Sequence, residues 1–248
     1  HFDAHADTGD IEFGSLWGHG QPMRRLIESG ALRGDRFLQV GLRGYWPGPE
    51  TLEWMAAQRM RSFEMTEIGV RGLDDCLTEA STIATDECEG VFLSVDIDVC
   101  DPGHAPGTGT PEPGGLSARD LLDSVRRICL ELPVVGMDVV EVSPPYDHAD
   151  ITASLANRVV LEALSAKLWE DNGIKLGADG LQVTCGATQA LATVAQACLN
   201  PGDEVIVLCP HWPLIRGIVW TVGGVVIDAP LDAAFRDPEG VLSPLLNE

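Results

Sequence analysis

Basic residues are scarce in this chain of 248 residues. Lysine and arginine together number 16, against 38 aspartate and glutamate residues, and the formal net charge is -22. Binding nucleic acid requires Lys and Arg side chains that displace counterions from phosphates, so we expect no nucleic-acid partner. We expect most of the acidic side chains to be solvated surface groups.

Several other features are missing. The seven cysteines are scattered and contain no C-x-x-C pair, which indicates reduced thiols rather than a disulfide framework or a zinc knuckle. No apolar run is long enough to span a bilayer, and no targeting segment is found. We therefore expect a cytoplasmic protein with no membrane partner. Because the chain begins with His1-Phe2-Asp3, in what looks like the middle of a strand, we also expect it to be a fragment.

Short apolar runs alternate with helical patterns in the first two thirds of the chain. Such runs, bounded by turn residues, are typical of strands buried on both faces of a parallel sheet. The alternation predicts an α/β protein with three layers, α/β/α, and a mainly parallel sheet whose sites lie at the carboxyl ends of the strands. The expected strands are Phe37–Leu42, Gly90–Val99 and Val134–Val142, and the expected helices are Pro22–Leu32, Pro49–Arg61, Ala118–Leu132 and Ile151–Trp169.

A second α/β pattern begins after Trp169. We expect strands at Leu181–Thr184, at Val205–Cys209 and within Ile218–Asp228, and a helix at Ala187–Leu199. The boundary between the two patterns falls inside one continuous helical pattern, without the flexible linker that separates most domains. We predict two parts, residues 1–166 and 167–248.

Carboxylates and a histidine gather at two predicted strand ends. Asp3, His5 and Asp7 alternate, so on an extended strand their side chains would share one face, and Asp96 and Asp98 repeat this spacing. Burying four carboxylates together is costly without a counter-charge, which divalent cations supply. Either motif alone could consist of acids that cap loops and helices. The two together favour a site for Mn(II) or a similar ion.

The motifs resemble those of the arginase and agmatinase (ureohydrolase) family. Asp3-Ala4-His5-Ala6-Asp7 is similar to its D-A-H-x-D signature, and Ser94-Val95-Asp96-Ile97-Asp98, continuing to Gly115, is similar to its second signature. A third match is Met137 to Pro144. The three motifs occur in the family's order over about residues 1–165, which argues against a chance similarity.

The resemblance implies a centre with two Mn(II) ions. Asp3 and Asp96 would bridge the ions, Asp7 would hold one, and His5 with Asp98 would hold the other. Such a pair of ions lowers the pKa of a bound water and yields a hydroxide that attacks the guanidinium carbon. The family's sixth ligand is a histidine of an upstream Gly-Gly-Asp-His motif that this sequence does not contain. We therefore expect five of six ligands and an incomplete enzyme.

Two further residues match catalytic positions of the family. Glu141 matches the acid that binds the guanidinium group. A carboxylate suits this role, because it can accept two hydrogen bonds from the N–H groups of that planar cation. His19 matches the histidine that carries protons to the departing amine. A histidine before glycine can also be an ordinary loop residue, so the role of His19 depends on its context. Asp7 counts among the catalytic positions as well as the ligands.

The expected substrate is a small guanidino compound. Asp10 and Glu12 would repel the α-carboxylate of arginine and tolerate the cationic tail of agmatine, although both could simply face solvent. We predict an agmatinase-like activity, which would release urea and the polyamine putrescine. A guanidinobutyrate or guanidinopropionate hydrolase is a close alternative. The family usually assembles as trimers or hexamers, so a homo-oligomer is possible.

The remaining residues, about Leu168 to Glu248, resemble part of a class I/II aminotransferase that uses pyridoxal phosphate. The matching segments are Val183 to Leu191, Asn200 to Val205 and Cys209 to Pro213. The resemblance implies that Gly186, Ala187 and Thr188 cradle the cofactor phosphate and that Trp212 stacks on its ring, although Trp212 could equally be a core residue. The family's Schiff-base lysine is absent, so the cofactor is expected only for a complete aminotransferase part.

Three interpretations of this combination remain open. The chain could be a hydrolase fragment joined to a transferase fragment, by natural fusion or by faulty assembly of the gene sequence. It could be a section of a longer polypeptide with two enzymes. It could also be a binding or scaffold protein without catalytic activity.

Overall fold

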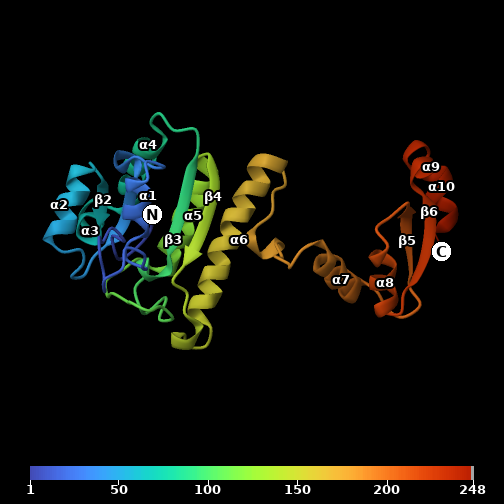
Figure 1. The fold of residues 1–248 in the computed structure, drawn as a ribbon. Coiled ribbons are helices and arrows are strands. Elements are labelled where there is room, and N and C mark those ends of the chain that lie inside the picture. The colour runs from blue at the N-terminus through green and yellow to red at the C-terminus, as the bar shows by residue number, and fades with distance from the viewer. Residues whose placement is uncertain (247–248) are drawn as a thin grey trace. The chain divides into compact units, whose positions relative to one another are not determined.

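The protein consists of two compact units. The computed structural model describes residues 1–246, and the chain divides into the two units between Leu181 and Gln182. Figure 1 shows a larger unit with a sheet and several helices, coloured blue to yellow, and a smaller unit of helices and one strand pair, coloured orange to red. No helix among the described residues combines the length and the apolar character needed to cross a membrane.

The first residues of the chain lie in the centre of the larger unit's sheet. Phe2 makes parallel bridges both to Val40, in strand β1 (Leu38–Leu42), and to Val95, in strand β3 (Val91–Asp96). The backbone nitrogen of Phe2 donates to Ser94 at 2.9 Å, and the nitrogen of Asp3 donates to Val40 at 3.1 Å. Phe2 is 1% exposed. This short segment therefore joins the two strands into one sheet.

Two more parallel strands extend the sheet outward. Strand β2 (Arg61–Glu64) pairs with β1, and β4 (Val134–Val140) pairs with β3. The order across the sheet is thus β2, β1, the Phe2 segment, β3 and β4. The parallel strands and the helices packed against them confirm the predicted α/β class.

Six helices belong to the larger unit. They are α1 (Pro22–Glu28), α2 (Pro49–Ala57), α3 (Met65–Arg71), α4 (Leu73–Thr85), α5 (Ala118–Glu131) and α6 (Ile151–Asn172). Apolar side chains of α3, α4, α5 and α6 form one buried core with those of the strands. Ser117 caps α5, since its side chain accepts a hydrogen bond from the Asp120 nitrogen while Asp120 accepts one from the Ser117 nitrogen.

The observed elements differ from the predicted ones mainly at their ends. Helices α1 and α2 are shorter than expected, and α6 continues to Asn172. Strand β3 ends at Asp96, where a 3-10 turn (Ile97–Val99) begins, and β4 ends at Val140. Strand β2 and helices α3 and α4 were not predicted from the sequence. Their segments carry charged side chains, notably Arg61, that obscure the apolar periodicity.

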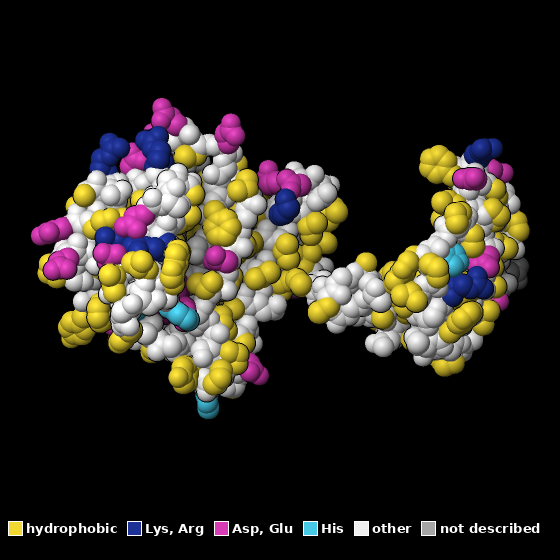
Figure 2. Space-filling view, in the orientation of Figure 1, with side chains coloured by type: hydrophobic (Ala, Val, Ile, Leu, Met, Phe, Trp, Pro, Cys, Tyr) yellow, Lys and Arg dark blue, Asp and Glu magenta, His cyan; other side chains and the backbone are white. Residues whose placement is uncertain are grey.

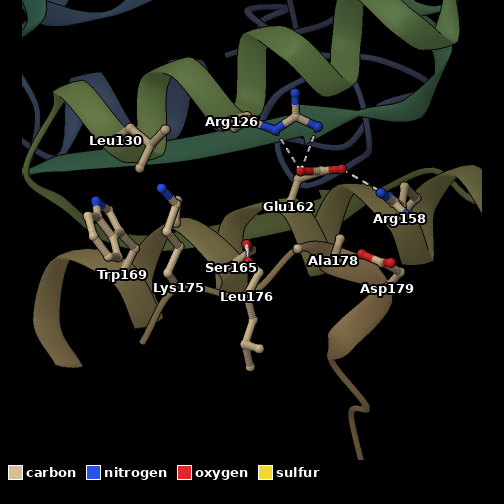
Figure 3. Close-up of a pocket in the computed structure, with 12 residues that line it drawn as sticks. Arg126, Leu130, Arg158, Glu162, Ser165, Trp169, Lys175, Leu176, Ala178 and Asp179 are labelled. Atoms are coloured by element: carbon tan, nitrogen blue, oxygen red, sulfur yellow. Dashed lines mark hydrogen bonds and ion pairs between the residues drawn. The ribbon is translucent and has the colours of Figure 1, made fainter. Parts of the chain in front are cut away.

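A buried carboxylate joins α5 to α6. Glu162, on α6, accepts hydrogen bonds from Arg126 at 2.8 Å and from Arg158 at 2.9 Å, and its side chain is 5% exposed. Figure 3 shows these side chains converging at one end of a hollow of about 510 Å³ that Trp169 and Lys175 also line. Because the carboxylate is satisfied on both oxygens, this ion-pair cluster is explained by helix packing.

The smaller unit has one parallel strand pair, β5 (Glu204–Cys209) with β6 (Val225–Pro230). Its helices are α7 (Ala187–Cys198), α8 (Leu214–Thr221), α9 (Leu231–Arg236) and α10 (Pro238–Leu242). The prediction of a strand at Leu181–Thr184 is wrong, because this segment pairs with no strand among the described residues. The strand expected within Ile218–Asp228 begins only at Val225, since the residues before it belong to α8 and a turn.

The surfaces of the two units differ in character. In the larger unit, Figure 2 shows Lys and Arg side chains beside Asp and Glu side chains. Two of the ion pairs of this unit join Arg36 to Asp86 and Arg61 to Glu67. In the smaller unit the view is dominated by hydrophobic side chains. Phe235, on α9, and Trp220, on α8, are largely exposed.

Candidate metal centre

The five predicted ligands lie at one end of the central strands. Asp3 directly follows Phe2, Asp96 is the last residue of β3, and Asp98 lies in the 3-10 turn after it. The expectation that Asp3, His5 and Asp7 lie on one extended strand is wrong. Only Phe2 makes bridges, and the chain then bends, with Asp7 at φ 51°. The bend, rather than strand alternation, brings the side chains together.

One carboxylate belongs to two groups of potential ligands. Donor atoms of Asp3, His5 and Asp98 lie within 4.8 Å of one another, and so do those of His1, Asp3 and Asp7. Asp96 belongs to neither group, but its Oδ1 accepts a hydrogen bond from the backbone nitrogen of Asp98 at 3.0 Å. The arrangement could therefore hold two ions that share Asp3.

The carboxylates strongly affect the ionisation of one another. Burial raises the pKa of Asp96 to about 10, and the charges of Asp3 and Asp98 add to this effect. Burial likewise raises the pKa of Asp3 and raises that of Asp7 to about 7. Burial first, and then repulsion between the carboxylates, disfavours their charged forms, and protons or metal ions can offset this cost.

His5 is the cation that partly compensates the cluster. Its Nδ1 lies 3.0 Å from Asp98 Oδ2 and 3.6 Å from Asp3 Oδ1. The carboxylates of Asp3 and Asp98 raise the pKa of His5 to about 10. Burial acts to raise the pKa of Asp98, but the contact with His5 outweighs it and holds this pKa below its usual value. A metal ion on these residues would displace the imidazole proton.

Several buried polar atoms of the cluster lack partners. Among the described residues, Asp3 Oδ2 and both ring nitrogens of His1 make no hydrogen bond. Asp3 and His1 are each about 1% exposed in their side chains. Leaving such groups unpaired costs about 1–3 kcal/mol each. Carboxylate and imidazole donors of this kind suit Mn(II), so the residues fit the predicted metal centre.

Two residues that were not predicted from the sequence hold residues 96–100, the ligand loop, in place. Arg43, just after β1, donates to the carbonyl oxygens of Asp98, Val99 and Cys100 at 2.8, 3.2 and 3.1 Å. Thr110 Oγ1 donates to Asp98 Oδ2 at 3.3 Å. Arg43 stands in the short sequence Gly41-Leu42-Arg43-Gly44. A charged residue directly after a fully buried strand was a pattern that could have indicated its role.

The two predicted catalytic residues, His19 and Glu141, form a pair. His19 Nδ1 lies 2.7 Å from Glu141 Oε1, and this contact raises the pKa of His19. The pair lies close enough to the cluster that the charge of Glu141 contributes to the raised pKa of Asp7. Glu141 and Asp7 both have positive φ, 59° and 51°. Backbone strain of this kind often occurs at functional sites.

The two acids expected to select the substrate have different surroundings. Asp10 pairs with Arg25 at 3.0 Å and with Arg24 at 3.4 Å, so its charge is largely compensated. Glu12 has no cationic partner among the described residues, and its charge contributes to the raised pKa of Asp7. Of the two acids, only Glu12 keeps an uncompensated charge near the cluster.

The residues expected to bind pyridoxal phosphate lie in the smaller unit. Gly186, at φ 83°, precedes helix α7, and Ala187 and Thr188 form its exposed first turn. Trp212 is 45% exposed, in the segment between β5 and α8. The role of these residues stays a prediction.

Comparison with known proteins gives two family matches. Residues 1–166 match the sequence model of the Arginase family, and residues 144–239 match that of aminotransferase classes I and II. Among curated relatives, proclavaminate amidinohydrolase of Streptomyces clavuligerus is 41% identical over 167 residues, 66% of this chain and 51% of the relative. Guanidinobutyrase of Pseudomonas aeruginosa is 39% identical over 166 residues, 66% of this chain and 50% of the relative. Agmatinase of Gallus gallus is 38% identical over 164 residues, 66% of this chain and 47% of the relative.

Solved structures give the same result. Proclavaminate amidino hydrolase from Streptomyces clavuligerus aligns with a TM-score of 0.61 at 39% identity, over 66% of this chain and 54% of that chain. Formimidoylglutamase from Bacillus subtilis aligns with a TM-score of 0.64 at 33% identity, over 67% of this chain and 51% of that chain. The likeness confirms the predicted three-layer fold of the first part. The chain spans about half the length of the curated relatives that it matches.

Proposed function

Because the chain belongs to the arginase family, we propose that residues 1–166 are the hydrolase part of a protein that hydrolyses guanidino compounds with two Mn(II) ions. The observation that carries this proposal is the position of Asp3, whose carboxylate belongs to both groups of potential ligands. Asp7 would complete one ion's set, and His5 with Asp98 the other. Asp96, whose Oδ1 accepts a hydrogen bond from the backbone nitrogen of Asp98, would be a further ligand.

The bound ions would supply a water of lowered pKa and a positive field at the reacting carbon. The residues of this chain would orient the substrate and move protons. Glu141 would accept hydrogen bonds from the N–H groups of the guanidinium, and this charge-assisted pairing would fix the plane of that group. His19 would take up a proton while it contacts Glu141 and give it to the departing amine.

For the substrate's tail, we propose the cationic amine of agmatine. Glu12 supports this choice, because its negative charge near Asp7 favours a cationic group and disfavours a carboxylate. The products would be urea and putrescine.

A guanidino acid is the second candidate substrate, and a specific observation supports it. Arg24 and Arg25 compensate Asp10, the other acid on which a preference for agmatine depends. The relatives guanidinobutyrase and guanidinopropionase, both from Pseudomonas aeruginosa, are 39% and 40% identical to this chain.

For the second part, residues 167–248, we propose only an aminotransferase-like segment. The two family matches overlap over residues 144–166, which include the first part of helix α6. The compact units divide later, after Leu181. The helix and the segment after it therefore pack with the hydrolase part, although the sequence likeness there is already to aminotransferases.

Metal binding and urea release test the proposal together. The chain should retain two Mn(II) ions after gel filtration, and Asp96→Ala should lose most of them. Asp74→Ala is the matched control, since Asp74 is 94% exposed and lies far from the ligand loop in sequence. Equal Mn(II) content in wild type and Asp96→Ala would contradict the metal centre. With the upstream segment of a related gene joined to the chain and Mn(II) bound, urea release should be faster from agmatine than from guanidinobutyrate or arginine. If none of the three compounds released urea from this completed, metal-loaded protein, the catalytic part would be wrong.

A further inference from the structure

A histidine outside the predicted ligand set lies against the metal centre. His1 Nε2 is 3.2 Å from Asp3 Oδ2, and donor atoms of His1, Asp3 and Asp7 all lie within 4.8 Å of one another. We propose that the His1 imidazole is a ligand of the ion that Asp3 and Asp7 hold. The inference rests on the proposed metal centre and adds a residue to it.

The contact between His1 and Asp3 does not have the geometry of a hydrogen bond. Neither His1 Nε2 nor Asp3 Oδ2 has a hydrogen-bond partner among the described residues, despite their separation of 3.2 Å. Two ligand atoms at right angles on a divalent ion, with bonds of about 2.1 Å, lie about 3 Å apart. The observed distance therefore suits two atoms that share an ion.

Burial strengthens the case for a ligand. The His1 side chain is 1% exposed and its ring stacks on Phe37, with ring centroids 5.6 Å apart. Stacking fixes the plane of the ring, and the backbone nitrogen of His1 donates to Leu38 at 2.9 Å. An imidazole held in place beside carboxylates, without hydrogen bonds, loses free energy unless it binds something. A cation shared with Asp3 removes this cost.

The substitution His1→Phe tests the inference, because phenylalanine can keep the stacking on Phe37 and removes both ring nitrogens. His104→Phe is the matched control, since His104 is exposed. Calorimetric titration of the 248-residue chain with Mn(II) should show at least a tenfold weaker site in His1→Phe and an unchanged second site. The control should bind as the wild type does. Circular dichroism and the metal-free Tm report whether each variant folds.

A second measurement uses the wild type alone. Pulsed EPR of the Mn(II)-loaded protein with 15N-labelled histidine should show couplings to two imidazoles, His1 and His5. A single imidazole coupling would overturn the inference even if His1→Phe failed to fold.

The possible outcomes separate this inference from the proposed function. If folded His1→Phe bound both ions like the wild type while Asp96→Ala lost them, His1 would not be a ligand and the metal centre would stand. If the wild type bound no Mn(II), both would be wrong. A selective loss of one site in His1→Phe would support both.

Discussion

His19 Nδ1 lies 2.7 Å from Glu141 Oε1, although the two residues are 122 positions apart in the sequence. His19 lies in the long loop before α1, and Glu141 directly follows β4. The contact places the predicted proton carrier on the predicted guanidinium-binding acid. A substrate that binds Glu141 must therefore share this carboxylate with His19 or displace the imidazole.

We expect Glu141→Gln to weaken substrate recognition without removing metal. A neutral amide loses a charge-assisted hydrogen bond of about 1.5–3 kcal/mol, so kcat/KM should fall about 10- to 150-fold. Mn(II) content should stay the same. In an NMR titration, the pKa of His19 should move down toward its ordinary value, because Glu141 raises it in the wild type. An unchanged His19 titration would show that the pair does not exist in solution.

Arg43→Met should destabilise the protein and loosen the ligand loop. The guanidinium donates to the carbonyls of Asp98, Val99 and Cys100. The Val99 carbonyl would keep its hydrogen bond from the Leu116 nitrogen, but a buried carbonyl left unpaired costs about 1–3 kcal/mol. We expect a loss of at least about 2 kcal/mol in the free energy of unfolding, measured by urea denaturation, and weaker Mn(II) binding. Arg59→Met is the control, because Arg59 is 76% exposed and pairs with Asp35. Equal destabilisation by both substitutions would contradict this role of Arg43.

The residues that gather at the candidate metal centre could largely be predicted from the sequence, but their geometry could not. The spacing of Asp3, His5 and Asp7 pointed to the proposed ligands, but they do not alternate along a strand, because the chain bends after Phe2. His1, which continues the same alternation, was not among the predicted ligands. The role that we propose for His1 depends on its stacking with Phe37, a contact between distant segments that no local pattern contains.

Elements with a clear apolar pattern were predicted, whereas the charged segment that forms β2 and α3 was not. Strand β1 is buried at every position and stands out as an apolar run. In β2 and α3, Arg61 and Arg71 contact the Phe63 ring and pair with Glu67. Charged side chains that pack in this way hide the apolar periodicity. The strand expected at Leu181–Thr184 failed for the opposite reason, because apolar residues alone do not provide a pairing partner.

The stability of the larger unit should depend on pH through Glu67. Hydrogen bonds from Arg61, and then from Arg71, lower the pKa of Glu67 to about 2. A carboxylate with a lowered pKa stabilises the fold above its unfolded pKa of about 4.3, and this contribution disappears as the pH falls toward 2. Wild type should therefore be more stable than Glu67→Gln at pH 6, and the difference should vanish near pH 2. Urea midpoints at several pH values measure it, and a constant difference would count against the ion pair.

Glu12 should influence the choice between agmatine and a guanidino acid. The Glu12→Gln substitution removes the uncompensated negative charge near Asp7, so the ratio of kcat/KM for agmatine to that for guanidinobutyrate should fall several-fold. Glu50→Gln, at the exposed start of α2, is the control and should leave the ratio unchanged. A ratio that did not change in Glu12→Gln would favour a site in which the tail points elsewhere.

Pyridoxal phosphate should bind weakly, if at all, and form no internal aldimine in this chain. The printed sequence contains two lysines, Lys167 and Lys175. Both belong to the larger unit, whereas Gly186, Ala187 and Thr188 belong to the smaller one. Lys175 lies within 5.4 Å of the Trp169 ring, with which it makes a cation–π contact. An aldimine needs a lysine amine held at the cofactor's aldehyde, and neither lysine lies in the smaller unit.

Absorbance spectra after gel filtration with the cofactor should match those of Lys175→Arg. A band that appeared only in the wild type would show that Lys175 reaches the cofactor and that the two units form one site.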